Sequence, residues 1–368
     1  MDEAERREAA GTRLRFAELL DPAPASWWSL LPQIGVTDVI GLLADGEQLR
    51  RWMRPTPGDP LGWIAADQSA PPKGERAWEQ AALRRLQEGY RERGLTLVGL
   101  EDSPPMDLIR LGLPGRDEQI EWWIDMIRAA GSLGLRVLCY NWMAIRGWLR
   151  TDVAIPSRGG ARVSGYSTRA IDAHPRAAQP GQHTAEQLWD GLAYFLGAVL
   201  PEAEASGVVL GMHPDDPPLP TISGLPRIMN SVENYDRLLR LSDSPSNGIT
   251  FCQGNFSLMS GDLAGLIRRW SDRIAYVHLR DVVGEVDDFR ETFHDDGPTD
   301  LLACMRAYAE IGFTGPMRPD HVPTLAGEDN DRPGYMVLGR LHAFGYLAGL
   351  REAAYGKPVC ARREASGS

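Results

Sequence analysis

The sequence predicts a single α/β domain folded as a (β/α)8, or TIM, barrel, and two observations support this prediction. Short segments rich in β-branched and aliphatic residues alternate with longer amphipathic segments, which is the pattern of parallel strands joined by helical crossovers. Eight such pairs can be counted along the 368 residues. This number favours a closed barrel over an open, doubly wound sheet.

The expected strands and helices follow one another in strict alternation. The strands are expected at residues 13–18, 36–42, 96–101, 136–140, 207–213, 248–252, 275–279 and 316–319. The helices are expected at residues 27–33, 74–93, 116–133, 185–206, 232–241, 263–271, 299–311 and 334–354. Glycines stand where left-handed C-caps are usual, after helices and before strands, at Gly94, Gly134, Gly207 and Gly312.

Two segments depart from this alternation. Residues 144–182 are rich in Gly, Arg, Ser and Pro, and we expect them to form an insertion after the fourth strand, near the active-site face. Such an insertion either forms a lid or wall of the site or is a structureless surface excursion. Residues 357–368 are typical of a disordered tail, so the predicted domain spans residues 1–356.

The composition argues against several classes of protein. Hydrophobic residues make up 43% of the chain, and no apolar run approaches the roughly 20 residues that span a bilayer, so no membrane partner is expected. A net charge of −11 without a basic run argues against nucleic-acid binding. The charged N-terminus lacks the apolar segment of a signal peptide, which indicates a cytoplasmic protein. Four scattered cysteines indicate reduced thiols.

Four potential metal ligands stand at or just past the ends of four consecutive expected strands. They are His213, Cys252, His278 and Asp320. Strand ends of a parallel barrel are neighbours around one rim, so these side chains are expected to converge on one point. Taken singly, each has a structural alternative, such as a hydrogen-bonded histidine or a small buried thiol. Their joint occurrence on successive strands predicts a metal centre.

The ligand set constrains the ion without identifying it. Two imidazoles, one thiolate and one carboxylate combine soft and hard donors, and raw affinity favours Zn²⁺ or Cu²⁺ over Mn²⁺. Four ligands would close a tetrahedral zinc site, whereas an ion that takes five or six ligands keeps positions open for substrate oxygens. If the protein is an enzyme, its site is therefore expected to hold one octahedral divalent ion. Mn²⁺ is expected first, with Fe²⁺, Co²⁺, Ni²⁺ or Zn²⁺ as alternatives.

Several motifs resemble the mannonate dehydratase family. They are LGLPGRDEQIEWW at 111–123, LCYNWM at 138–143, GMHPDDPPLPTISGLPRIMNSVENYDRLL at 211–239, SPSNGITFCQGN at 244–255, RIAYVHLRDV at 273–282 and GPMRPDH at 315–321. The resemblance spans roughly residues 94–350. It implies a metal-dependent barrel enzyme that removes water from D-mannonate to give 2-keto-3-deoxy-D-gluconate, with the four ligands named above holding the ion.

The resemblance also implies a catalytic pair, His321 directly after the ligand Asp320, and Tyr335 in RPGYMVLGR. Dehydration of a 2,3-dihydroxy acid needs a base for the proton beside the carboxylate and an acid for the departing hydroxide. The sequence does not say which residue is the base. In the structural alternatives, His321 orients Asp320 and Tyr335 begins a helix.

Three further residues are candidates for substrate contacts. Arg280, two residues after His278, could grip a carboxylate through two hydrogen bonds, or pair with a neighbouring aspartate instead. Asn141 ends the fourth strand, and His294 lies in the FHDD segment. The adjacent Asp215 and Asp216 precede two prolines, and we interpret them as turn and helix-capping residues.

The chain departs from the family in two segments that face the substrate. The family usually carries Arg-Trp-Tyr-Gly on the first strand, whereas here Arg15 is followed by Phe, Ala and Glu. After the fourth strand, the usual Pro-Val-Phe-Asp-Trp is replaced by the sequence AIRGW at 144–148. The chemistry is therefore better supported than the substrate, and a related polyhydroxy acid is an alternative to mannonate.

Other functions remain open at this stage. Metal-dependent sugar isomerases and epimerases use similar barrels, but they generally have several carboxylate ligands, and Cys252 favours the dehydratase. A carbohydrate sensor without turnover is a third hypothesis. The small-molecule partner is expected to be a sugar acid, and the resemblance implies a homodimer or a larger homo-oligomer.

Overall fold

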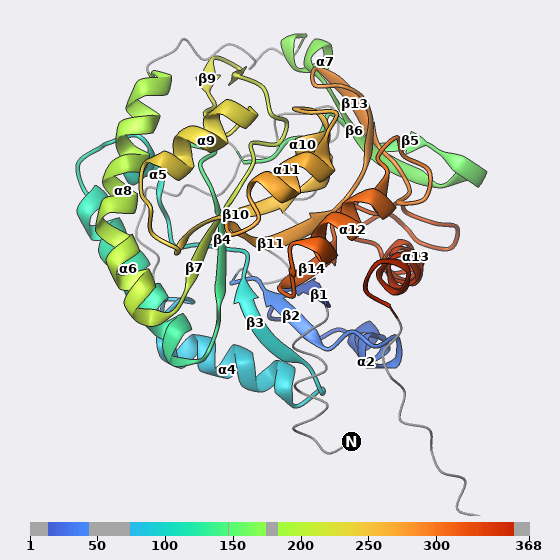
Figure 1. The fold of residues 1–368 in the computed structure, drawn as a ribbon, viewed down its shortest axis with the longest axis horizontal. Coiled ribbons are helices and arrows are strands. Elements are labelled where there is room, and N and C mark those ends of the chain that lie inside the picture. Colours follow the sequence, from blue (N-terminus) through green and yellow to red (C-terminus); the bar gives the residue numbers. More distant parts are fainter. Residues whose placement is uncertain (1–13, 44–73, 146, 174–182, 357–368) are drawn as a thin grey trace, which may run out of the picture.

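A closed barrel of eight parallel strands forms the centre of the protein (Figure 1). The computed structural model describes residues 14–43, 74–145, 147–173 and 183–356. The strand order around the barrel is β1-β14-β11-β10-β7-β4-β3-β2. The strands are β1 (Arg15–Leu20), β2 (Asp38–Gly41), β3 (Thr96–Leu100), β4 (Val137–Asn141), β7 (Val209–His213), β10 (Asn247–Cys252), β11 (Ile274–Leu279) and β14 (Pro316–Pro319). All eight expected strands are present, and the predicted barrel is confirmed.

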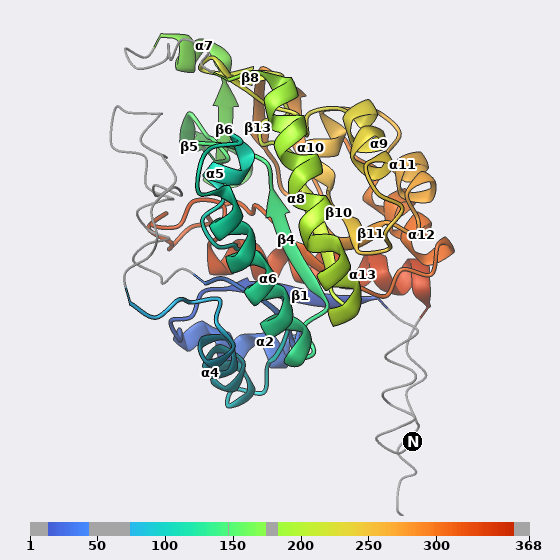
Figure 2. The same cartoon turned by 90° about the vertical axis from the view of Figure 1, so that its left-hand side faces the viewer.

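Helices surround this barrel on the outside, as Figures 1 and 2 show. The helices that follow barrel strands are η1 (Ser26–Ser29) with α2 (Leu30–Gln33), α4 (Gln80–Arg91), α6 (Arg116–Ser132), α8 (Ala185–Ser206), α9 (Val232–Arg240), α11 (Leu263–Arg269), α12 (Leu301–Glu310) and α13 (Val337–Tyr355). One expected helix, at 74–93, begins later than predicted, at Gln80. The helix expected at 27–33 is divided into a 3-10 turn and one α-helical turn.

Local sequence explains the bounds of the longest of these helices, α8. Thr184 accepts a hydrogen bond from the Gln187 backbone, and the Gln187 side chain accepts one from the Thr184 backbone, which forms a capping box. Gly207 ends the helix in the left-handed conformation, with φ 66° and ψ 33°. The other three glycines predicted as C-caps also have positive φ.

The core has two layers because barrel strands are buried on both faces. On β1, Ala17 and Leu19 belong to the cluster inside the barrel. Phe16 and Leu20 point the other way, into the larger cluster between the barrel and the helices. This period-2 alternation of buried side chains fixes the strand register, because a shift by one residue would exchange the two layers. Each fully buried side chain of this size contributes roughly 1.5–3 kcal/mol.

A second, antiparallel sheet lies beside the C-terminal ends of the barrel strands, in the order β12-β13-β6-β5 (Figure 2). It combines β5 (Asp152–Pro156) and β6 (Arg162–Ser167) with the hairpin of β12 (Val282–Glu285) and β13 (Asp288–Glu291). We call these four strands the side sheet. The insertion expected at 144–182 therefore contributes regular strands, which its Gly- and Pro-rich composition did not indicate. Of this insertion, residues 146 and 174–182 lie outside the described part.

Several short elements complete the chain. They are α5 (Asp107–Arg110), η2 (Arg158–Gly160), α7 (Thr168–Asp172), the pair β8 (Thr221–Ile222) and β9 (Leu225–Pro226), and α10 (Gln253–Ser257). The tail predicted at 357–368 lies outside the described residues, and the single-domain span of 1–356 stays a prediction. Among the described helices, none combines the length and apolar character needed to cross a membrane.

Candidate metal centre and active site

Four side chains meet at the C-terminal rim of β7, β10, β11 and β14. Cys252 ends β10, His278 is the last but one residue of the neighbouring β11, and the two are direct register partners. One ligand atom each of His213, Cys252 and His278 lies within 4.8 Å of the other two. Asp320, the residue after β14, places Oδ2 3.9 Å from the Cys252 Sγ and 3.9 Å from the His278 Nδ1. The structure thus brings together all four residues that the sequence predicted as ligands.

A backbone carbonyl orients the first of these residues, His213. Its Nδ1 lies 2.7 Å from the carbonyl oxygen of Pro214, so this nitrogen carries the hydrogen and donates it. Burial, followed by the nearby His278, lowers the pKa of His213 to about 4. The ring is therefore neutral, and its Nε2 keeps the lone pair that a metal ion requires.

The carboxylate of Glu101 orients the second imidazole. Glu101 Oε2 lies 3.1 Å from the His278 Nε2, and Glu101 is held in turn by Arg318 at 2.8 Å and by the Tyr276 hydroxyl at 3.0 Å. The Nδ1 of His278 is buried without a hydrogen-bond partner in the described structure. A buried nitrogen without a partner is costly unless a ligand such as a metal ion satisfies it. This carboxylate–histidine arrangement is the usual support of a metal-binding imidazole.

Asp320 and Cys252 are the two candidate donors that can carry a negative charge. Burial alone would raise the pKa of Asp320, but His321, Arg318 and other cations outweigh it, so the pKa lies well below the usual range. Arg318 Nη1 holds Oδ1 of this carboxylate at 2.8 Å, which leaves Oδ2 toward the other ligand atoms. Burial raises the pKa of the Cys252 thiol, so ligation would release a proton from this group.

A second group of potential ligands overlaps the first at His278. It comprises Glu101, Cys139 and His278, whose ligand atoms also lie within 4.8 Å of one another. Glu101 already accepts two hydrogen bonds from the Arg318 guanidinium, at 2.8 and 3.2 Å. A cation there would lie beside this guanidinium, and the like charges would repel. The geometry therefore favours the group that contains His213 and Cys252.

The predicted catalytic pair lies directly beside these ligands. The Nε2 of His321 is 3.2 Å from the Tyr335 hydroxyl oxygen, and this hydroxyl lies 3.4 Å from the Asp320 Oδ1. Both side chains are largely buried, and the indole of Trp148 covers the imidazole at a ring separation of 5.3 Å. Burial raises the pKa of Tyr335 well above its usual value, so the phenol keeps its proton.

Two arginines and two carboxylates form a buried network under His321. Arg150 binds Asp216 through both terminal nitrogens, at 2.8 and 2.9 Å, and binds Glu291 at 2.8 Å. Arg280 binds the same two carboxylates, Asp216 at 2.9 Å and Glu291 at 2.8 Å. Glu291 Oε1 also lies 2.8 Å from the His321 Nδ1. The alternation of signs compensates the cost of burying four charges.

Arg280 also reaches toward the candidate metal ligands. Its Nη1 lies 3.7 Å from the Cys252 Sγ and 3.7 Å from the Asp320 Oδ2. Its Nη2 is buried without a hydrogen-bond partner in the part of the chain that the structure describes. An unused guanidinium donor at this point can bind a carboxylate oxygen of a substrate.

The other predicted contact residues are held by neighbours. Asn141 accepts hydrogen bonds at Oδ1 from Arg110 at 2.9 Å and from the backbone of Met143 at 3.1 Å. His294 is buried, and its Nε2 lies 2.8 Å from the Leu279 carbonyl oxygen. Leu279 precedes Arg280, so His294 contacts the backbone that carries that side chain.

The prediction that Asp215 and Asp216 have a helix-capping role was wrong. Helix α9 is capped by Ser231, and Asp216 forms ion pairs with two buried arginines. Asp215 is buried and accepts a hydrogen bond from the Met229 backbone at 2.7 Å. The two prolines that follow suggested a turn, but no local pattern indicated that Arg150 and Arg280 approach from distant segments.

Sequence reasoning missed four residues that support the site: Glu101, Arg150, Glu291 and Arg318. Glu101 directly follows β3, so the strand-end pattern that selected the metal ligands could have found it. Arg318 lies within β14, one position before the strand ends. Arg150 and Glu291 lie in or beside the side sheet, which was not predicted, and no signal in the sequence pointed to them.

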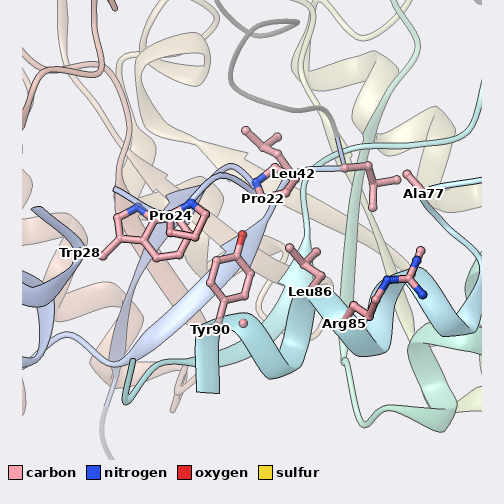
Figure 3. A pocket seen from close by; sticks show the side chains of 11 residues that line it. Pro22, Pro24, Trp28, Leu42, Ala77, Arg85, Leu86 and Tyr90 are labelled. Atoms are coloured by element: carbon pink, nitrogen blue, oxygen red, sulfur yellow. The ribbon is translucent and has the colours of Figure 1, made fainter. Parts of the chain in front are cut away.

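A separate apolar cavity of about 290 Å³ lies between the segments after β1 and β2 and helix α4 (Figure 3). Its lining includes Trp28, Leu42, Leu86 and Tyr90. The Tyr90 hydroxyl donates to the backbone carbonyl oxygens of Leu20, at the end of β1, and of Asp21, at 2.9 and 3.0 Å. Among its described lining residues, there is no cluster of ionisable groups comparable to that at the rim of β7, β10, β11 and β14.

A model of the D-mannonate dehydratase family matches residues 59–179 and 181–358. The chain belongs to the D-mannonate dehydratase family. Mannonate dehydratase 1 of Bacillus licheniformis is 35% identical over 312 residues, which cover 76% of this chain and 85% of the relative. The mannonate dehydratase of Shouchella clausii is 35% identical over 326 residues, which cover 80% and 89%. The family predicted from the sequence is confirmed.

The solved structures agree with this family assignment. The mannonate dehydratase from Streptococcus suis serotype 2 superposes with a TM-score of 0.78 at 28% identity, covering 97% of this chain and 98% of that one. An L-ribulose 3-epimerase matches with a TM-score of 0.52 at 14% identity. The second likeness shows a common barrel fold alone, so it does not favour an epimerase.

Proposed function

We propose that this member of the D-mannonate dehydratase family is a metal-dependent hydro-lyase that converts D-mannonate to 2-keto-3-deoxy-D-gluconate. One observation carries the proposal. The proton-transfer pair His321 and Tyr335 is buried directly beside the candidate ligand Asp320, with the Tyr335 hydroxyl 3.4 Å from its Oδ1. A sugar acid bound at the metal centre would therefore present its reacting carbons to both groups.

We propose that His213, Cys252, His278 and Asp320 hold one divalent ion, with Mn²⁺ as the physiological metal and Fe²⁺, Co²⁺, Ni²⁺ or Zn²⁺ as competitors. The orientation of each donor and the unpartnered Nδ1 of His278 support this assignment. When bound, such an ion supplies positive charge that stabilises the negative charge developing on the substrate.

The geometry supports a proton path through the catalytic pair. The C2–H bond of the substrate breaks, its proton passes to the His321 Nε2, and its electron pair forms the C2–C3 double bond as the C3–O bond breaks. Tyr335 donates its phenolic proton to the departing hydroxide, which leaves as water. The 3.2 Å contact between the two side chains then lets His321 return the proton to Tyr335. The remaining enol becomes the 2-keto acid by moving its hydroxyl proton to C3.

We propose that Arg280, Asn141 and His294 contribute to substrate binding in different ways. Arg280 would bind the substrate carboxylate through its buried, unused Nη2. Asn141 would donate from Nδ2, because its Oδ1 already accepts from Arg110. His294 would act indirectly, by holding the backbone beside Arg280 through its contact with the Leu279 carbonyl.

The proposal extends to a cytoplasmic homo-oligomer with a small sugar acid as its partner. Family membership supports the partner, and the acidic composition fits a protein that binds no nucleic acid. Light scattering after size-exclusion chromatography measures the oligomeric state. A single-chain mass across the working concentration range would contradict the homo-oligomer.

Turnover of D-mannonate tests the proposed function. We expect protein loaded with Mn²⁺ to convert D-mannonate to a product that is lighter by one water and contains a 2-keto-3-deoxy group. The His321→Asn variant, which removes the proposed base, should bind the metal and produce none. A product of unchanged mass would indicate an isomerase, and no product from any aldonic acid would indicate a sensor.

A further inference from the structure

The tautomer of His321 follows from the atoms around its ring. Its Nδ1 lies 2.8 Å from Glu291 Oε1, and its Nε2 lies 3.2 Å from the Tyr335 hydroxyl. An ionised carboxylate only accepts hydrogen bonds, so Nδ1 must carry the hydrogen of the neutral ring. The lone pair is then on Nε2, where the Tyr335 hydroxyl can donate to it. Arg150 Nη2, 3.2 Å from Nδ1, already donates to the same Glu291 oxygen at 2.8 Å.

The neighbours of Glu291 keep its carboxylate ionised and fixed in place. Arg150 donates to Oε1 from Nε at 3.1 Å as well as from Nη2, and Arg280 donates to Oε2 from Nε at 2.8 Å. Asp216 binds both arginines from the other side. All four side chains are at most 3% exposed, so water does not compete for these bonds. Rotation of the carboxylate would break several charge-assisted hydrogen bonds at once.

We propose that Glu291 is a positioning residue of the dehydration, which holds His321 in the tautomer whose Nε2 faces the reacting carbon as proton acceptor. This inference rests on the proposed role of His321. Without Glu291, the ring could carry its hydrogen on Nε2 or rotate, and either change removes the lone pair from the site. The same carboxylate stabilises the imidazolium that forms when Nε2 takes the proton.

This arrangement implies that the side sheet helps to position His321. Glu291 is the last residue of β13, and Arg150 lies just before β5. The two segments that form the side sheet therefore each place a charged group near the Nδ1 of His321. Neither side chain is exposed to solvent. The side sheet therefore acts as a fixed support for the proposed base.

Nitrogen NMR of histidine-labelled protein tests the tautomer directly. In the wild-type chain loaded with diamagnetic Zn²⁺, we expect the His321 hydrogen on Nδ1 and a lone-pair shift for Nε2. The His321→Asn variant assigns the signals by their loss. A hydrogen on Nε2 would overturn the proposal, and this measurement needs neither turnover nor a variant of Glu291. Its result is therefore independent of whether D-mannonate is the substrate.

Kinetics distinguish positioning from simple structural support. For Glu291→Gln, we expect kcat to fall by about 100-fold or more, with KM within a few-fold and the metal content unchanged. Glu285→Gln is the matched control, because Glu285 is exposed on the same hairpin and should keep wild-type kcat. If Glu291→Gln unfolds more easily but keeps wild-type kcat per metal-loaded molecule, the residue is only structural and the proposal is wrong. If Glu291→Gln does not fold, the NMR measurement of the His321 tautomer in the wild-type protein decides whether the proposal is correct.

Discussion

Three of the four proposed ligands have a neighbour that fixes which of their atoms would face a bound ion. The Pro214 carbonyl does this for His213, Glu101 for His278, and Arg318 for Asp320. Such neighbours set the tautomer and the angle of a ligand, so their loss weakens a metal site without removing a donor.

Glu101 provides the test of this principle. We expect Glu101→Gln to lower metal affinity by about 10–100-fold, because the amide holds His278 and Arg318 less strongly than the carboxylate does. Competition with a metal chelator measures the affinity. Glu92→Gln, an exposed change on the neighbouring helix, should have no effect. Equal affinities in wild type and Glu101→Gln would show that Glu101 does not support the site.

Substituting the two buried cysteines of the barrel distinguishes between the two possible ligand groups, because one group contains Cys252 and the other contains Cys139. We expect Cys252→Ser to lose most of the bound metal, and Cys139→Ser to retain it, because Arg318 opposes a cation beside Glu101. Metal content by elemental analysis after dialysis measures both variants. The reverse pattern would move the ion to the group of Glu101, Cys139 and His278.

The sequence could predict several residues at the ends of barrel strands, although Glu101 and Arg318 were missed there, and it predicted none of the site residues on or beside the side sheet. His213, Cys252 and Asp320 were found because parallel strand ends converge whatever the details of the loops. Glu291 lies on a hairpin strand that no pattern predicted, and its partner Arg150 is 141 positions away in the chain. A contact at that separation depends on tertiary packing, which local patterns do not encode.

At the scale of elements, helix α8 shows how packing outside the barrel reaches the site. Its Gly191 lies so close to α5 that an added Cβ would be 2.7 Å from the Ile109 carbonyl oxygen and 2.9 Å from that of Arg110. Arg110 in turn binds Asn141 at the end of β4. A side chain at position 191 would therefore displace the segment that orients a proposed substrate contact.

Two glycines of this helix form a matched pair for a test. Gly191→Ala should destabilise the protein by about 1–3 kcal/mol through overpacking, and it should raise KM through the shift of α5. Gly197→Ala, where nothing lies within 4 Å of the added Cβ, should stabilise it by roughly 0.5–1 kcal/mol. Denaturant unfolding measures both free energies. Equal effects at the two positions would show that the close approach to α5 does not exist.

Barrel strands and their helices were predictable because each unit repeats a local strand–helix pattern, and four of the helices are followed by a recognisable glycine. Helix α8 was predicted over the residues that it occupies, since a capping box and Gly207 mark its ends. The strands β5, β6, β12 and β13 were missed because they lie in the segments after β4 and β11, outside the strand–helix alternation on which the prediction depends. Their pairing joins two insertions that are far apart in the chain.

For the whole molecule, buried carboxylates make stability depend on acid pH. Burial alone would raise the pKa of Glu291, but Arg280, His321 and Arg150 outweigh it and lower the pKa to about 2. A carboxyl whose pKa is lower in the folded chain stabilises it above the ordinary value of 4.5 and loses this contribution as the pH falls toward 2.

We therefore expect the free energy of unfolding to fall steeply between about pH 5 and pH 2, with Glu291 alone contributing on the order of 3 kcal/mol. Urea unfolding across this range measures the slope. In Glu291→Gln the slope should be shallower, whereas Glu285→Gln should follow the wild type. Parallel curves for Glu291→Gln and wild type would contradict the ionised, arginine-bound state of this carboxyl.

The proposed chemistry depends on one divalent ion at the rim of β7, β10, β11 and β14. Crystals grown with Mn²⁺ and measured for its anomalous scattering test this claim most directly. We expect a single strong peak within bonding distance of His213 Nε2, Cys252 Sγ, His278 Nδ1 and Asp320 Oδ2. A peak between Glu101 and Cys139, or none at this rim in protein that is saturated with Mn²⁺, would contradict it.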